Sequence, residues 1–149
     1  MAPPRRLIAT PLQVWERDGV AAALTKAGLP ADDIADPYVL LWRFETYEDV
    51  PVGFGGLEIC DYDALLRSVV TLPSLRRVGM GAAIVNALEA EARARRCQAI
   101  FLLTATEADF FTRLGYAQSK RDNAPIALRA SLQFASPALA NATLMMKRL

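Results

Sequence analysis

The feature that most constrains the fold is a change of hydrophobic period in residues 66–94. Residues 64–71 have strand character, and Pro73 lies just beyond them. Beyond it, apolar side chains recur every four residues, as on one face of a helix, at Met80, Ile84, Leu88 and Ala92. A strand that passes through a short turn into a long amphipathic helix predicts a mixed α+β fold.

The start of this helix carries small residues, which let a ligand approach the backbone. Gly79, Gly81 and Ala82 stand in its first turn, where N–H groups have no acceptor within the helix. Together with the positive end of the helix dipole, these donors form an anion site, and Arg76 and Arg77 add positive charge. The sequence therefore predicts a bound phosphate or pyrophosphate.

Two common phosphate-binding motifs do not fit this segment. A dinucleotide-binding loop needs a third glycine where Ile84 stands, and a P-loop needs a Gly-Lys-Ser/Thr sequence that this chain lacks. The phosphate ligand is therefore of another kind.

The other elements complete a single domain over residues 1–149. We expect a helix that begins at Thr10-Pro11 and runs to Gly28, with Trp15 in the core or a pocket wall. A second helix is expected over residues 107–114, capped by Thr106, and residues 125–134 have helical character. Strands are expected over residues 6–9, 38–45, 52–59, 64–71, 99–103, 116–119 and 143–147. Three glycines in the third strand predict a bulge or a close backbone approach: Gly53, Gly55 and Gly56.

Composition excludes several classes of function. Seventeen basic and sixteen acidic residues give a net charge of +1, which argues against a nucleic-acid partner. With no histidine, the chain can form neither a Ser-His-Asp triad nor a histidine-ligated metal site, and we expect no metal. Cys60 and Cys97 are expected to be buried thiols. No apolar segment approaches the ~20 residues of a membrane span, so we expect a cytoplasmic protein with no membrane partner.

Two motifs in this order resemble the GNAT acetyltransferase family. Arg76, Gly79 and Gly81 match its Arg/Gln-x-x-Gly-x-Gly/Ala pattern, and residues 110–116, Phe-Phe-Thr-Arg-Leu-Gly-Tyr, resemble its later helix-and-turn signature. The resemblance extends from about residue 7 to the end of the chain. It implies the GNAT fold: a central, mostly antiparallel mixed sheet flanked by helices, with an acetyl-CoA cleft between splayed strands. It also implies direct acetyl transfer from acetyl-CoA to a small-molecule primary amine.

The resemblance also implies which residues bind acetyl-CoA. The pantetheine would pair with the strand at Val69, Val70 and Thr71, with the Val70 N–H stabilising the oxyanion. Thr104 and Phe111 would contact the same arm, Phe111 where relatives often place a tyrosine. The pyrophosphate would bind the segment made up of Arg76, Arg77, Val78, Gly79, Met80, Gly81 and Ala82.

Catalytic groups are less clearly marked, because the glutamate that relatives place early in the strand before the motif is missing. Glu58 is the best candidate base, with Asp61 and Asp63 as runners-up acting through water. A salt bridge to Arg67 explains Glu58 equally well, and Arg67 could instead bind an anionic group of the substrate. Tyr116 is a candidate acid, with water as the alternative.

A narrower resemblance points to the arsenic-resistance-associated branch of the family. Residues 56–58, 65–68, 102–104 and 109–111 and the tail from Phe134 to Lys147 look like that branch, although Ala138 stands near a position where it often carries cysteine. Two alternatives stay open, a non-catalytic acyl-CoA sensor and a protein N-acetyltransferase. The apolar tail is expected to be a core strand or the edge strand of a homodimer.

Overall fold

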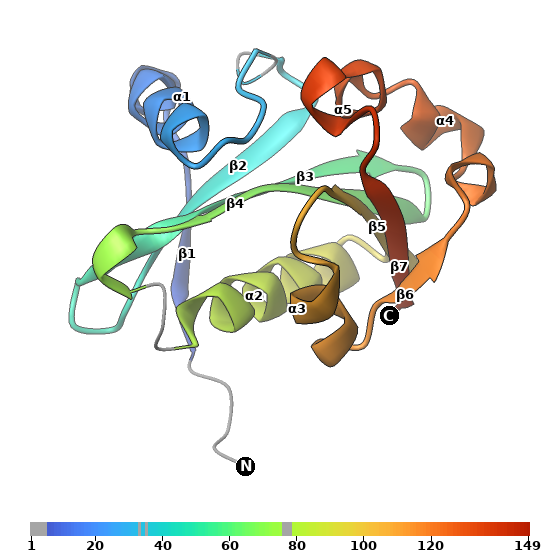
Figure 1. The fold of residues 1–149 in the computed structure, drawn as a ribbon. Coiled ribbons are helices and arrows are strands. Elements are labelled where there is room, and N and C mark those ends of the chain that lie inside the picture. Colours follow the sequence, from blue (N-terminus) through green and yellow to red (C-terminus); the bar gives the residue numbers. More distant parts are fainter. Residues whose placement is uncertain (1–5, 33, 35, 76–78) are drawn as a thin grey trace.

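The computed structural model describes residues 6–32, 34, 36–75 and 79–149. Within these residues a single twisted sheet runs through the molecule, and helices cover both of its faces (Figure 1). The strands are β1 Ile8–Pro11, β2 Val39–Glu45, β3 Pro51–Cys60, β4 Asp63–Thr71, β5 Ala99–Thr104, β6 Ala117–Ser119 and β7 Thr143–Arg148.

The strand order is β1-β2-β3-β4-β5-β7-β6, and β4 with β5 form the parallel pair among otherwise antiparallel neighbours in the described sheet. The fold is therefore the mixed, mostly antiparallel α+β sheet expected from the sequence. β7 lies between β5 and β6, which confirms the prediction of a core strand for the apolar tail and rules out the edge-strand alternative.

Helices divide between the two faces of the sheet. The helices are α1 Arg17–Lys26, α2 Met80–Ala94, α3 Ala108–Arg113, α4 Ile126–Arg129 and α5 Leu132–Ala135, with 3-10 turns at Val14–Glu16, Pro73–Leu75, Arg121–Asn123 and Pro137–Leu139. α2 and α3 cover one face, while α1 covers one end of the opposite face and α4 and α5 the other end (Figure 1). None of the described helices is long and apolar enough to cross a membrane.

A bulge in β4 decides which face each of its residues meets. Arg67 pairs with Gly56 and Val70 with Phe54, so Ser68 and Val69 together stand opposite the single residue Gly55. Ser68 has a φ of 60°, in the left-handed region that a bulge uses. The extra residue turns Val69 toward the α2 face and Val70 toward the core beneath α1.

The bulge also coincides with the divergence of β4 from β5. The parallel pairing covers three residue pairs, Asp63 with Ala99 through Leu65 with Phe101, and stops there in the described ladder. β5 continues to pair with β7 up to Thr104. The last six residues of β4, 66–71, therefore lie beyond its pairing with β5, and the two strands splay as the fold class predicted.

The strand predictions are confirmed to within two residues, and α3 begins within one residue of its prediction, but the predicted start of α1 and the predicted cap of α3 are wrong. Thr10 and Pro11 belong to β1, where they pair with Arg43 and Trp42, and α1 begins only at Arg17. The pairing energy of a sheet edge outweighs the local preference of Thr-Pro for a helix start. At α3 the Glu107 N–H is bound by the Thr104 hydroxyl, 2.9 Å away, rather than by Thr106.

Candidate functional site

The start of α2 presents free backbone donors. The residue before it, Gly79, has a φ of 78° and caps the helix with no side-chain hydrogen bond. The first hydrogen bond of the helix is donated by the Ala83 N–H to the Gly79 carbonyl oxygen, at 3.2 Å. The N–H groups of Met80, Gly81 and Ala82 thus precede the helical ladder and have no acceptor within α2.

Three of the residues predicted to bind the pyrophosphate, Arg76, Arg77 and Val78, lie outside the described residues. Met80 is described, and its side chain is buried in the core, so it offers a bound anion only its backbone N–H. What the described part of this segment contributes is a row of amides at the positive end of a fifteen-residue helix.

Gly81 faces the end of β4 and the ring of Phe110 on α3. A Cβ atom on Gly81 would lie 3.4 Å from Phe110 Cζ and 3.5 Å from the Thr71 hydroxyl oxygen. The α2 start, the end of β4 and α3 therefore meet at this point, beside the splay. Phe110 was noticed in the sequence only as part of a motif, and its neighbour Phe111 was chosen instead.

The structure places Phe111 away from this junction. Phe111 is buried in the core under α2, where its ring packs edge-to-face on Phe110 and on Tyr116, with centroids 5.0 and 5.5 Å apart. The cofactor contact expected of Phe111 stays a prediction, and Phe110 is the ring that faces Gly81. Thr104 ends β5 at the splay, but its hydroxyl oxygen already accepts the Glu107 N–H.

On the other face of the sheet, Glu58 belongs to a small polar cluster. Arg67 Nη1 lies 3.0 Å from Glu58 Oε2, and the Ser131 hydroxyl donates to the same oxygen at 2.8 Å. The Arg67 side chain is fully buried and that of Glu58 is 15% exposed. Arg67 Nε also donates to the Ser68 hydroxyl at 3.0 Å, so the cluster reaches the bulge.

These contacts change the roles expected for two residues. Arg67, predicted to bind an anionic group of the substrate, instead holds Glu58 and Ser68 from a position without solvent access. Glu58 has only one of its two carboxylate oxygens engaged, because Oε1 makes no hydrogen bond within the described structure. Gly56, opposite Arg67, is required by β2, since a Cβ there would lie 2.8 Å from both the Leu40 carbonyl oxygen and Leu41 Cδ2.

Asp61 and Asp63 lie at the β3–β4 turn, at the opposite end of β4 from α2. Asp63 is five residues from Ser68, roughly 16 Å along a strand. Burial, and then the charge of Asp61, raises the pKa of the Asp63 carboxyl above its ordinary value. Neither aspartate joins the Glu58 cluster.

Tyr116 is buried in a second polar cluster beneath α2. Its hydroxyl donates to Glu89 Oε2 at 2.9 Å, and Lys147 Nζ lies 3.0 Å from Glu89 Oε1 and 2.9 Å from the Leu114 carbonyl oxygen. Burial, and then the Glu89 charge, raises the pKa of Tyr116 well above its ordinary value. A phenol that holds its proton this firmly, bonded to an internal carboxylate, is a poor general acid, and we do not carry it forward.

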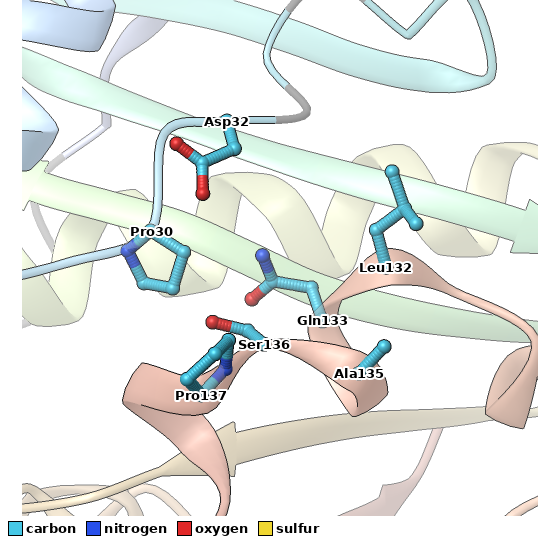
Figure 2. Close-up of a pocket in the computed structure, with 7 residues that line it drawn as sticks. All are labelled: Pro30, Asp32, Leu132, Gln133, Ala135, Ser136 and Pro137. Carbon is cyan, nitrogen blue, oxygen red and sulfur yellow. The ribbon is translucent and has the colours of Figure 1, made fainter.

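A pocket of about 200 Å³ lies between the segment after α1 and the segment around α5. Figure 2 shows it on the face of the sheet opposite α2, with Asp32 and Pro30 on one side and Gln133, Ser136 and Pro137 on the other. Sequence reasoning missed this pocket and also Ser131. A serine before a short apolar run is an N-cap signal, but nothing in it indicates the distant Glu58.

Comparison with known proteins matches this geometry to one family. The profile of the acetyltransferase (GNAT) family matches residues 9–116. No curated protein matches the sequence. Among the described residues, no group of three or more histidine, cysteine, aspartate or glutamate side chains could hold a metal ion.

Solved structures share the fold at low sequence identity. N-acetylglutamate synthase from Neisseria gonorrhoeae, complexed with coenzyme A and L-arginine, aligns with a TM-score of 0.75 and 14% identity. The alignment covers 97% of this chain and 34% of that protein, so the chain spans about a third of the length of this relative. A GNAT-family acetyltransferase from Staphylococcus aureus Mu50 aligns with a TM-score of 0.73 and 13% identity over 96% and 99% of the two chains. An aminoglycoside 6'-N-acetyltransferase complexed with coenzyme A aligns with a TM-score of 0.64 and 17% identity, over 95% of this chain and 96% of that protein.

Proposed function

We propose that this chain, which belongs to the acetyltransferase (GNAT) family, transfers the acetyl group of acetyl-CoA to a primary amine of a small molecule. One observation carries the proposal: the amides that open α2 stand beside the splay of β4 from β5, and the Glu58 cluster reaches the same strand from the other face. Two solved structures with this fold contain coenzyme A. The site thus has a place for the donor and a base for the acceptor.

The described residues fit the parts of acetyl-CoA. The N–H groups of Met80, Gly81 and Ala82 suit the diphosphate, because they are free of the helical ladder and carry the positive end of the dipole. The edge of β4 at Val69 and Val70 lies beyond the pairing with β5 and suits the pantetheine, whose amides can take the place of a neighbouring strand. In this proposal the pantetheine continues along β4 to Thr71. Phe110 supplies an apolar wall between the two. In this proposal Arg76, Arg77 and Val78 flank the diphosphate.

Glu58 accepts the proton of the attacking ammonium on Oε1, through a water. Its other oxygen, Oε2, is fixed by Arg67 and Ser131, so the carboxylate keeps one orientation during the reaction. The neutral amine attacks the thioester carbonyl, the C–N bond forms and the C–S bond breaks. The Val70 N–H, just past the bulge, stabilises the charge that develops on the carbonyl oxygen.

The departing thiolate takes its proton from water. A thiol with a pKa near ~8.5 is an acceptable leaving group at neutral pH, so no dedicated acid is needed. This agrees with Phe111 standing where relatives place a tyrosine, and with Tyr116 donating to Glu89.

The test is the release of free CoA from acetyl-CoA across a panel of amino acids, polyamines, aminoglycosides and amino-bearing organoarsenicals. With the best acceptor, Glu58→Gln should lower kcat by about 10²- to 10⁴-fold, the usual contribution of a general base. Acetyl-CoA affinity should stay unchanged, because Glu58 lies on the opposite face of the sheet from α2. Asp18→Asn, which changes an exposed carboxylate on α1, is the control and should keep full activity.

Glu58→Gln leaves the buried Arg67 guanidinium without its carboxylate, which destabilises the fold. The double variant Glu58→Gln/Arg67→Met removes both charges and should fold while remaining inactive. If a folded Glu58→Gln variant keeps the kcat of the parent, Glu58 is not the base.

A second candidate function is that of a non-catalytic acyl-CoA sensor. The observation in its favour is that the described residues bring no phenol or other acid to the leaving thiolate. Stabilisation by acetyl-CoA in a melting experiment, together with no CoA release from any amine in the panel, would establish the sensor in place of the enzyme.

Four narrower hypotheses rest on sequence alone. They are an acceptor linked to arsenical resistance, a cytoplasmic setting, a homodimer and, as an alternative, a protein acceptor. The organoarsenical arm of the panel tests the first, and light scattering of the purified protein tests the third. A peptide substrate that outperforms every small amine would favour the fourth.

A further inference from the structure

The pocket beside α5 holds polar groups that the fold itself leaves unused. Gln133 is 93% buried, since only 7% of its surface is exposed, yet its side-chain amide makes no hydrogen bond within the described structure. The hydroxyl of Ser136 and the carboxylate of Asp32 are also without a hydrogen-bond partner there. Figure 2 shows the Gln133 amide and the Ser136 hydroxyl on the side of the pocket that faces Pro30, with the Asp32 carboxylate on the other side of Pro30 at the edge of the pocket.

The Gln133 side chain is largely buried, but its amide atoms are not sealed from solvent, so a ligand in the pocket would take the place of water as their hydrogen-bond partner. Each of the three groups offers an oxygen: the carboxylate, the amide carbonyl and the hydroxyl. An ammonium carries three N–H donors and no acceptor, so this set of oxygens matches it. Among the described residues that line the pocket, Asp32 alone carries a formal charge, and its sign attracts a cation.

No basic side chain among the described residues lines the pocket. Residues 31–36 contain three aspartates and no lysine or arginine. Two arginines on neighbouring segments are engaged elsewhere. Arg121, which precedes α4, donates to the carbonyl oxygens of Leu139 and Phe134, and Arg67 is bound to Glu58. Arg17, which lies against the same segment, donates to the carbonyl oxygens of Ile34 and Asp36 and is not among the lining residues. A carboxylate or arsonate group would therefore find no counterion among the described residues that line the pocket.

A group that binds in this pocket would be distinct from the acceptor amine that is acetylated. Glu58 and the residues of β4 are not part of its lining. The two places are nevertheless connected, because the Ser131 hydroxyl donates to Glu58 and accepts the backbone N–H of Gln133 at 3.1 Å. At about 200 Å³ the pocket is smaller than the ~300–1,000 Å³ of sites for drug-sized ligands, so it suits one end of a small molecule.

We propose that Asp32, Gln133 and Ser136 form a subsite for a second ammonium group of the acceptor, so that the substrate is a small diamine or polyamine. This inference rests on the proposed function, because the first amino group is the one acetylated beside Glu58. The distant cation anchors the molecule, and the reacting amine is then presented toward the splay.

The experiment compares three acceptors with the same number of carbon atoms, four: 1,4-diaminobutane, butylamine and 4-aminobutanoate. Their dissociation constants are measured by calorimetry on protein saturated with CoA, which gives a readout that does not depend on turnover. The diamine should bind most tightly and the amino acid most weakly. Asp32→Asn should weaken the diamine by about two- to fivefold at low salt, since Asp32 is exposed, and the effect should shrink as salt is added.

Gln133→Leu removes the buried amide and should weaken the diamine by about tenfold while leaving butylamine unchanged. Asp49→Asn is the matched control, because Asp49 is exposed and belongs to the β2–β3 turn. That turn lies at the end of the β2–β3 hairpin that points away from α5 (Figure 1). It should bind the diamine like the parent protein.

Equal affinity for all three compounds, or a preference for 4-aminobutanoate or an amino-bearing arsonate, would overturn the subsite. Acetylation of such an anionic amine would leave the acetyltransferase proposal standing. Conversely, tight, Asp32-dependent binding of the diamine with no CoA release in turnover assays would support the subsite and refute the acetyl transfer.

Discussion

Gly81 offers the sharpest test of the α2 start, because folding and cofactor binding should respond to its replacement in opposite directions. The Cβ atom of an alanine at this position would stand 3.4 Å from Phe110 Cζ and 3.5 Å from the Thr71 hydroxyl oxygen. Both distances are at the edge of ordinary contact, so the folded chain accepts the methyl group. In a helix interior, alanine is favoured over glycine by up to about 1 kcal/mol. Gly81→Ala should therefore be neutral or slightly stabilising without ligand.

The same methyl occupies the space beside the free amides, where acetyl-CoA has to approach the backbone. A diphosphate displaced from one amide loses a charge-assisted hydrogen bond worth about 1.5–3 kcal/mol. The dissociation constant of acetyl-CoA should then rise by about 10- to 100-fold.

The assay is calorimetry with acetyl-CoA, supported by thermal melts with and without saturating ligand. A tenfold loss of affinity removes about 1.4 kcal/mol of ligand-induced stabilisation, or roughly 3 °C in Tm for a chain of this size. Gly19→Ala is the control, because nothing lies within 4 Å of its added Cβ on α1. It should gain stability and bind acetyl-CoA normally. An unchanged acetyl-CoA affinity in Gly81→Ala would refute the assignment of the α2 start to the diphosphate.

Two further predictions concern the polar clusters. Tyr116→Phe should lower the free energy of unfolding by about 1.5–3 kcal/mol at pH 7, because it removes the bond to Glu89, while leaving kcat unchanged. Since the pKa of Tyr116 is raised in the folded state, the phenol of the unfolded chain loses its proton at a lower pH than that of the folded chain. Above pH 10 the free energy of unfolding of the parent should therefore fall by up to about 1.4 kcal/mol per pH unit, and the stability difference between the parent and Tyr116→Phe should narrow. Denaturant titrations of both proteins at pH 7 and pH 11 measure this difference, and the same difference at both pH values would contradict the prediction. Ser131→Ala should reduce kcat by about five- to tenfold, because Glu58 Oε2 loses the hydrogen bond from the Ser131 hydroxyl. Ser131→Thr keeps a hydroxyl and should keep most of the kcat of the parent. Equal losses of kcat in both variants in steady-state assays would indicate a purely structural role for Ser131.

Local signals in the sequence predicted the scaffold well. The four-residue spacing from Met80 to Ala92 and the glycines before it were enough to predict α2 and its amide-bearing start. The cluster of glycines at Gly53 to Gly56 predicted an irregular strand, and the bulge lies opposite Gly55. These features depend on neighbours in the chain, which a sequence shows directly.

Contacts between distant segments were not visible in the sequence. Ser131 and Glu58 are 73 residues apart, and only the docking of α5 on the sheet brings them together. Asp32 and Gln133 face one pocket for the same reason. Trp15 was expected in the core or a pocket wall, but it is 78% exposed, because Thr10 and Pro11 extend β1 and shift the turn that carries it. Trp42, by contrast, is buried in the core.

The left-handed residue at Ser68 is one residue more than the pairing of β4 with β3 requires. With this extra residue, the strand supplies Leu66 and Val69 to the interior under α2 and Val70 to the separate interior under α1. Deleting Ser68 would leave Val69 alone opposite Gly55 and Val70 opposite Phe54, so strict alternation would return with both valines on their present sides. In engineering, removal of the bulge should therefore change the backbone beside the splay while both interiors keep their side chains.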